Sequence, residues 1–105
     1  MLEKINFGNG VLSKHFGSKI YSNISLESQI DALTEDILQV NYSNSYCIDV
    51  GWYPEFNIKG HFLVLIIFSD DWENPIKKIT CNKIDDLLPA ITECIDIIQD
   101  LIKTI

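Results

Sequence analysis

The side chains best suited to catalysis or metal binding are scattered along this 105-residue chain. Three cysteines, Cys47, Cys81 and Cys94, and two histidines, His15 and His61, are the soft ligands. No two of them stand at the C-x-x-C or H-x-x-x-H spacing of a zinc site. A Cys–His dyad would need two of them brought together by the fold, and the spacing does not predict this. We therefore expect free thiols, with no metal, no cofactor and no catalytic residue.

Two pairs of adjacent acids, Asp70-Asp71 and Asp85-Asp86, are the remaining candidates for acid–base chemistry. Catalytic carboxylate pairs need a cleft and a set separation. The first pair is more typical of a solvated turn, and the second of a first helical turn, where acids complement the helix dipole. A non-enzymatic protein is the favoured interpretation. A small hydrolase that uses His61 or one of the acid pairs stays as an alternative.

Composition and charge exclude several functional classes. Eight lysines and fifteen acids give a formal net charge of −7, and the chain contains no arginine. A protein that binds nucleic acid directly would need a basic surface. The longest apolar run, Phe62–Phe68, is far too short to span a bilayer as a helix. The first residues, 1–4, lack the pattern of a signal peptide, so we expect a cytoplasmic protein without membrane contact.

The periodicity of residues 25–41 predicts a helix with Ser25 as its N-cap. The apolar residues recur at steps of four and three, which places them on one helical stripe. They are Leu26, Ile30, Leu33, Ile37 and Val40. Four acids fall off this stripe and would form an acidic solvent face: Glu27, Asp31, Glu35 and Asp36.

Three strands are predicted after this helix. Tyr46–Tyr53 alternates and is ended by Pro54, which has no N–H for the ladder. His61–Phe68 is apolar at both alternating sets of positions, which is typical of a central strand covered on both faces. Ile76–Cys81 carries lysines 77 and 78, as edge strands often do.

The two ends of the chain complete the prediction. A second helix is expected from Asn82, with its regular part beginning near Asp86 and Pro89 in its first turn. Residues 1–24 suggest a short strand at residues 5–7, a turn at residues 8–10 and a helical turn at residues 11–16. The predicted fold class is α+β: an antiparallel three- to four-stranded meander packed with two main helices, in a single domain spanning residues 1–105.

Two clusters combine aromatic and acidic side chains, residues 51–56 and residues 70–75. In a meander they fall at opposite ends of adjacent strands. Aromatic residues beside acids are typical anchors of protein–protein interfaces. The alternative is that Trp52 and Trp72 cap the hydrophobic core. The candidate partner-binding residues are Glu27, Asp31, Glu35, Asp36, Asp70, Asp71, Trp72 and Glu73.

Three motifs within residues 46–105 carry a resemblance to a known group of proteins. They are Gly51-Trp52-Tyr53-Pro54-Glu55, Gly60-His61-Phe62 and Trp72-Glu73-Asn74-Pro75-Ile76, followed by an acidic and apolar C-terminal helix. This pattern resembles the immunity proteins of bacterial polymorphic toxins, including those of contact-dependent growth inhibition systems. The resemblance implies an inhibitor that binds the C-terminal domain of one cognate toxin. It does not identify which residues form the interface.

Many toxins inhibited by such proteins are nucleases with basic clefts, so an acidic inhibitor fits the expected partner. Carboxylates can occupy phosphate-binding positions, and opposite potentials accelerate encounter. The alternative is a homo-oligomeric structural or interaction module without a toxin partner, in which a second subunit covers one face of the apolar strand at residues 61–68. We expect a monomer or a weak dimer.

Overall fold

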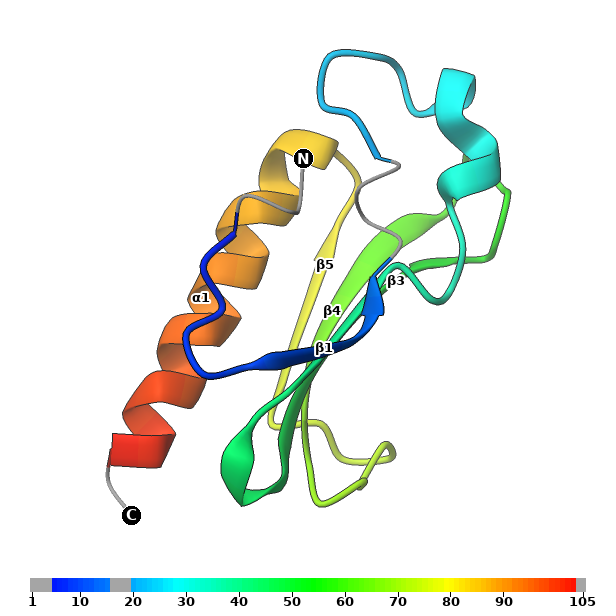
Figure 1. The fold of residues 1–105 in the computed structure, drawn as a ribbon. Helices are drawn as coiled ribbons and strands as arrows, with labels where there is room; N and C mark the ends of the chain where they lie inside the picture. Colours follow the sequence, from blue (N-terminus) through cyan, green and yellow to red (C-terminus); the bar gives the residue numbers. More distant parts are fainter. Residues whose placement is uncertain (1–4, 16–19, 104–105) are drawn as a thin grey trace.

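The computed structural model describes residues 5–15 and 20–103, which form a five-stranded antiparallel sheet with one long helix on one of its faces (Figure 1). The strands pair in chain order, so the sheet is a simple meander. The strands are β1 (Val11–His15), β2 (Leu38–Asn41), β3 (Tyr46–Tyr53), β4 (His61–Phe68) and β5 (Lys77–Cys81). The helix α1 spans Ile84–Lys103, and two short 3-10 helices, η3 (Glu27–Ala32) and η4 (Ser43–Ser45), precede β2 and β3.

The predicted α+β meander is confirmed, but the prediction of two main helices is wrong. Residues 25–41 form η3, an irregular segment and strand β2 instead of one helix. Backbone geometry breaks the helix at Gln29, whose φ is −126°. The Gln29 side chain is buried and exchanges two hydrogen bonds of 2.8 Å with the backbone of Tyr21. Pairing of β2 with two neighbouring strands then overrides the helical spacing.

The N-terminal region also differs from its prediction. The helical turn expected at residues 11–16 is wrong, because residues 11–15 form β1, which pairs with β2; residue 16 lies outside the described residues. The sheet therefore has five strands, more than the three or four predicted. The expected turn at residues 8–10 is confirmed: Gly8 has a φ of +65°, and the Gly10 N–H donates to the carbonyl oxygen of Phe7 at 3.2 Å. Residues 5–7 are irregular and form no strand.

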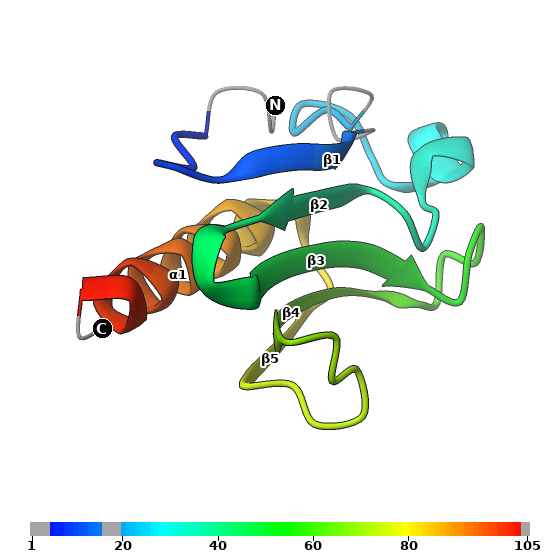
Figure 2. The ribbon, with the colours of Figure 1, turned by 60° about the horizontal axis from the view of Figure 1, so that its bottom comes forward.

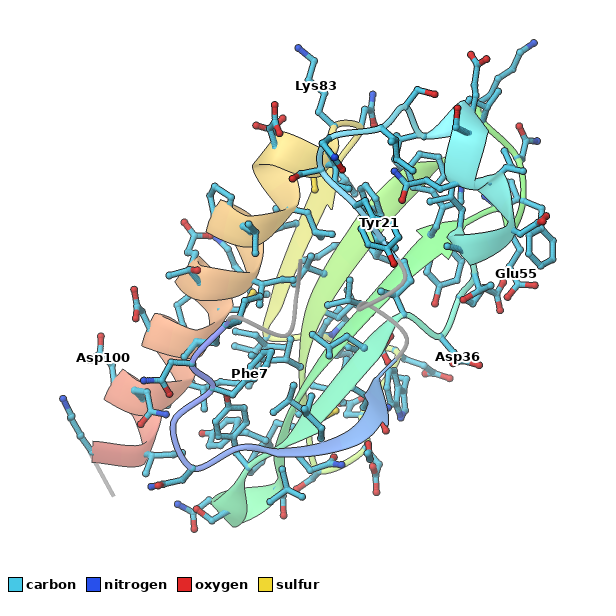
Figure 3. The ribbon with its side chains drawn as sticks, turned by 45° about the horizontal axis from the view of Figure 1, so that its top comes forward. Phe7, Tyr21, Asp36, Glu55, Lys83 and Asp100 are labelled. Carbon is cyan, nitrogen blue, oxygen red and sulfur yellow. The ribbon has the colours of Figure 1, made fainter. Side chains whose placement is uncertain are left out.

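The core lies between α1 and one face of the sheet. Phe7 is inserted between α1 and the sheet (Figure 3), and its carbonyl oxygen accepts a hydrogen bond from the buried Tyr42 hydroxyl at 2.8 Å. Burying each large aliphatic side chain stabilises the fold by about 1.5–3 kcal/mol. The central core residues are Ile48, Val50 and Trp52 of β3, Phe62, Val64 and Ile66 of β4, and Leu87, Ile91, Cys94 and Ile98 of α1.

The C-terminal helix is confirmed, although it begins at Ile84, earlier than the predicted regular start near Asp86. Pro89 consequently lies inside the helix, on its exposed side. Lys77 of β5 forms a salt bridge of 3.8 Å with Glu93 of α1 across the solvent-exposed edge of this layer. No helix in the described part of the chain has both the length and the apolar character needed to cross a membrane.

Strand β4 is central, as predicted, because it pairs with β3 and β5. The prediction that both of its faces are covered holds only in part. The helix covers the face that carries Phe62, whereas Leu63 and Leu65 point to the other side and are half-buried. Ile67, the next residue on that side, is only 1% exposed. We call the side of the sheet that faces away from α1 the open face; Figure 2 shows the helix on the opposite side.

Candidate protein-interaction surface

The acids predicted to bind a partner separate into two groups at opposite ends of the long strands. Glu27 and Asp31 lie on η3, and Glu35 and Asp36 lie in the turn before β2, next to the β3–β4 loop. Residues 70–73 lie in the β4–β5 loop, at the other end of β4 (Figure 1). The eight residues of β4 span about 23 Å at roughly 3.3 Å per residue, so the two groups form two separate surfaces.

The prediction that the first group lies on the solvent face of a long helix is wrong, because residues 33–37 form an irregular segment between η3 and β2. The Ile37 N–H donates to the carbonyl oxygen of Val50 at 3.0 Å, and the Trp52 N–H donates to that of Thr34 at 2.8 Å. Between these two bonds, the two residues Glu35 and Asp36 lie opposite the single residue Gly51, so this segment bulges away from β3 before β2 begins at Leu38. We call residues 35 and 36 the bulge. Both acidic side chains are exposed.

The β3–β4 loop holds this bulge in place. One carboxylate oxygen of Glu55 accepts a hydrogen bond from the Glu35 N–H at 2.8 Å. The Phe56 N–H donates to the carbonyl oxygen of Leu33 at 2.9 Å. Figure 3 shows Asp36 and Glu55 on the same side of the molecule, away from α1. The loop and the bulge therefore present their acids together.

Tyr53 lies beside these acids, because its ring and the Glu35 backbone both border Gly51. It is half-buried on the open face at the end of β3. Burial raises the pKa of its hydroxyl, and the negative charges of Asp49, Glu35, Asp36 and Glu55 raise it further. Each of these carboxylates is thus close enough to act on the tyrosine electrostatically. We call Tyr53, Glu35, Asp36, Asp49 and Glu55 the Tyr53 surface.

Three members of the Tyr53 surface, namely Asp49, Tyr53 and Glu55, were not among the sequence-predicted site residues. A signal for two of them was present, because residues 49 and 53 fall on the same side of an alternating strand. Asp49 is 7% exposed, and one of its carboxylate oxygens accepts a hydrogen bond from the Gln39 side-chain amide at 3.3 Å. Glu55 joins the surface only through the loop contact with the bulge, which sequence periodicity does not encode.

The two tryptophans have different environments. Trp52 is 1% exposed, packs edge-on against Phe62 with ring centroids 4.8 Å apart, and donates through Nε1 to the carbonyl oxygen of Asn57 at 2.8 Å. It therefore caps the core, and the Gly-Trp-Tyr-Pro-Glu motif has a large structural component. Trp72 is 46% exposed, so the alternative that it caps the core is wrong.

The second group of acids lies on an ordered loop. Ser69 and Asp70 have φ values of 51° and 59°, and the Asp71 N–H donates to the carbonyl oxygen of Phe68 at 3.1 Å. The Ser69 N–H also donates to the carbonyl oxygen of Ser45 at 2.9 Å, which ties this turn to η4. Asp70, Asp71, Trp72 and Glu73 are all exposed. This loop is a second candidate surface.

The side chains with reactive potential are placed unfavourably for nucleophilic chemistry. Cys94 is fully buried, and burial raises the pKa of its thiol to about 11. Burial, followed by the charge of Asp86, also raises the pKa of the half-buried Cys81. Thiols with raised pKa values carry little reactive thiolate at neutral pH. The Cys47 thiol donates to the carbonyl oxygen of Ile48, with the sulfur 3.6 Å from that oxygen. His61 is half-buried on the open face, in register with Tyr53.

The carboxylates of the two surfaces do not converge on a metal site. Within residues 5–15 and 20–103, no group of three histidine, cysteine, aspartate or glutamate side chains is placed to hold a metal ion.

The fold and the surfaces define an acidic α+β domain with a one-sided sheet. Comparison of the chain with protein-family models, with curated proteins and with solved structures gives no match in any of the three. The function is therefore inferred from the exposed side chains and their charges.

Proposed function

We propose that this chain is an immunity protein that binds a cognate toxin domain, a nuclease, and neutralises it by occluding its basic active-site cleft. The observation that carries the proposal is the exposed acidic surface beside Tyr53, where the Glu35 N–H donates to the Glu55 carboxylate at 2.8 Å and Asp36 follows Glu35 directly. Three segments that are separate in the sequence thus contribute acidic side chains to one surface beside Tyr53. The resemblance of residues 46–105 to polymorphic-toxin immunity proteins names the class.

A nuclease cleft is basic because it must hold phosphates, and the Tyr53 surface has the opposite charge. Complementary potentials raise association rates by roughly 10- to 1000-fold over neutral partners. Carboxylates fixed on a folded scaffold can also pair with the lysine and arginine side chains that would otherwise contact phosphate. The formal net charge of −7 adds a long-range attraction of the same sign.

The proposal places the protein in the cytoplasm, where a nuclease toxin meets its substrate. It acts there as a stoichiometric binder, without catalysis, cofactor or direct contact with nucleic acid. The raised pKa values of the Cys81 and Cys94 thiols are consistent with this reading, since neither thiol is activated.

The direct test is a protection assay in bacteria. We expect the reading frame upstream of the gene to end in a variable basic domain that stops growth when it is expressed. Co-expression of this chain should restore growth, and the two purified proteins should form a one-to-one complex. A toxic domain that the chain neither binds nor neutralises contradicts the proposal.

One observation favours the homo-oligomeric module as a second candidate: Leu63 and Leu65 on the open face are only half-buried. Sedimentation of the isolated protein at micromolar concentration separates the two functions. A stable dimer without a toxin partner would support the oligomeric module. The hydrolase alternative that uses His61 is tested by replacing this residue, because full protection by His61→Ala would eliminate it.

A further inference from the structure

The open face has an apolar centre beside the Tyr53 surface. Leu65 of β4 is the register partner of Asp49 on one side and of Lys78 on the other. Leu63 is the register partner of Gly51, over which the Glu35 backbone lies, and of Thr80. Directly opposed residues in a sheet lie about 4.5–5.5 Å apart, so the two leucines adjoin the part of β3 that carries the Tyr53 surface.

The chain itself leaves this apolar centre partly uncovered. The sheet contacts of α1 are made on the other face, through residues such as Val64 and Ile66. Ile67 is buried, so Leu63 and Leu65 are the large apolar side chains of β4 that stay partly accessible on the open face. Apolar side chains that stay partly accessible in the middle of a sheet face are a feature of surfaces that associate with another protein.

Charge decides between the possible occupants of this face. A second copy would carry the same acids and the same formal net charge of −7, so like-charge repulsion opposes the association of two copies through this face. Lys78, at the β5 side, is the cation in register with the apolar centre. A partner with basic side chains around an apolar centre avoids this conflict and matches both components of the face.

We propose that the open face, centred on Leu63 and Leu65 and bordered by the Tyr53 surface, is the docking site for a basic protein partner. This inference rests on the proposed function and assigns it to one of the two candidate surfaces. The toxin domain covers Leu63 and Leu65 with apolar side chains and places lysine or arginine side chains against Glu35 and Asp36. The β4–β5 loop with Trp72 lies outside the contact.

The test compares matched variants by calorimetric titration of the upstream toxin domain. Leu63→Thr/Leu65→Thr removes apolar surface and keeps residues that strands favour. Trp72→Ser removes an exposed apolar side chain at the far loop and serves as the control. We expect the double variant to bind about tenfold more weakly, the equivalent of about 1.4 kcal/mol, and the control to bind like the wild type.

A second measurement keeps the proposal testable if the double variant unfolds. Methyl NMR signals of Leu63 and Leu65 in the wild-type protein should shift on addition of the toxin domain, while the indole signal of Trp72 stays in place. The reverse pattern, with weaker binding by Trp72→Ser and unchanged binding by the double variant, overturns the assignment and leaves the proposed function standing.

Two further outcomes would each contradict the proposed docking site. If the wild-type protein does not bind the toxin domain, this result contradicts the proposed function and, with it, the proposed docking site. A wild-type dimer in sedimentation that the double variant dissociates identifies a second copy as the occupant, which overturns the proposal of a basic partner.

Discussion

The backbone carbonyl oxygen of Glu35 lies where a side chain on Gly51 would have to be. This contact links the bulge before β2 to the open face of β3. It explains a glycine in the interior of a strand, where that residue otherwise lowers stability. It also fixes the position of Glu35, one of the acids that surround Tyr53.

Replacing Gly51 by alanine should therefore destabilise the protein by about 1–3 kcal/mol, since the methyl group would collide with backbone rather than with a flexible side chain. Urea unfolding monitored by circular dichroism measures the change. Thr80→Ala, at an exposed position of the edge strand β5, is the control and should stay within about 0.5 kcal/mol of the wild type. A Gly51→Ala protein as stable as the control would contradict the assigned contact.

Removing one negative charge from the Tyr53 surface should lower the pKa of Tyr53. A nearby carboxylate opposes formation of the phenolate, so Glu35→Gln should move this pKa toward the ordinary value of 10.0. NMR titration of ring-labelled tyrosine resolves Tyr53 from the other three tyrosines. Glu73→Gln, at the far loop, should leave the titration unchanged. Equal effects of the two substitutions would mean that Glu35 does not face Tyr53.

Tyr42 should make the protein sensitive to alkali. Burial raises the pKa of its hydroxyl to about 12 from an ordinary 10.0, so the native state holds this proton more tightly than the unfolded state does. The resulting stability is fully present below pH 10.0 and is lost as the pH rises towards about 12. Tyr42→Phe should cost about 1 kcal/mol at neutral pH, because the buried carbonyl of Phe7 loses one of its two hydrogen bonds and keeps only the one from the Gly10 N–H.

The measurement for Tyr42 is the free energy of unfolding as a function of pH. Between pH 10 and about 12 the wild type should lose more stability than Tyr42→Phe does. Parallel curves for the two proteins across this interval would show that Tyr42 does not carry the effect.

The sequence predicts the second half of this fold well and the first half poorly. Strands β3, β4 and β5 and the C-terminal helix each carry an apolar pattern with clear ends, such as Pro54 after β3. The segment from residue 25 to residue 41 fails because its 4-3-4-3 spacing fits a helix, while its actual structure depends on partners far away in the chain. β2 exists because β1 and β3 pair with it.

The candidate site shows the same division. The sequence identifies Glu35 and Asp36 as exposed acids, and both are exposed. The sequence does not predict that these two acids lie next to Tyr53, because their position depends on the bulge opposite Gly51 and on the hydrogen bond from the Glu35 N–H to Glu55. Both are tertiary contacts between residues about 16–20 positions apart, beyond the range of helical or strand periodicity.

The turn at Ser69 and Asp70 should accept a stabilising substitution. Both residues have left-handed φ values, 51° and 59°, which Asn and Gly adopt at lower cost. Ser69→Asn/Asp70→Gly should raise the stability by about 1 kcal/mol, seen as a higher unfolding temperature. The same variant should protect cells as well as the wild type does, because the turn lies outside the proposed docking site. Loss of protection would assign the far loop to the interface.

The central claim is that the acids around Tyr53 attract a basic toxin, and the salt dependence of binding tests it most directly. Glu35→Lys and Glu73→Lys make the same change to the net charge, one at the Tyr53 surface and one at the far loop. The measurement is the dissociation constant for the toxin domain between about 50 mM and about 200 mM NaCl. Glu35→Lys should weaken binding by roughly tenfold or more and flatten its salt dependence, whereas Glu73→Lys should have a small effect. Wild-type binding that is insensitive to salt and equal in both variants would contradict the account.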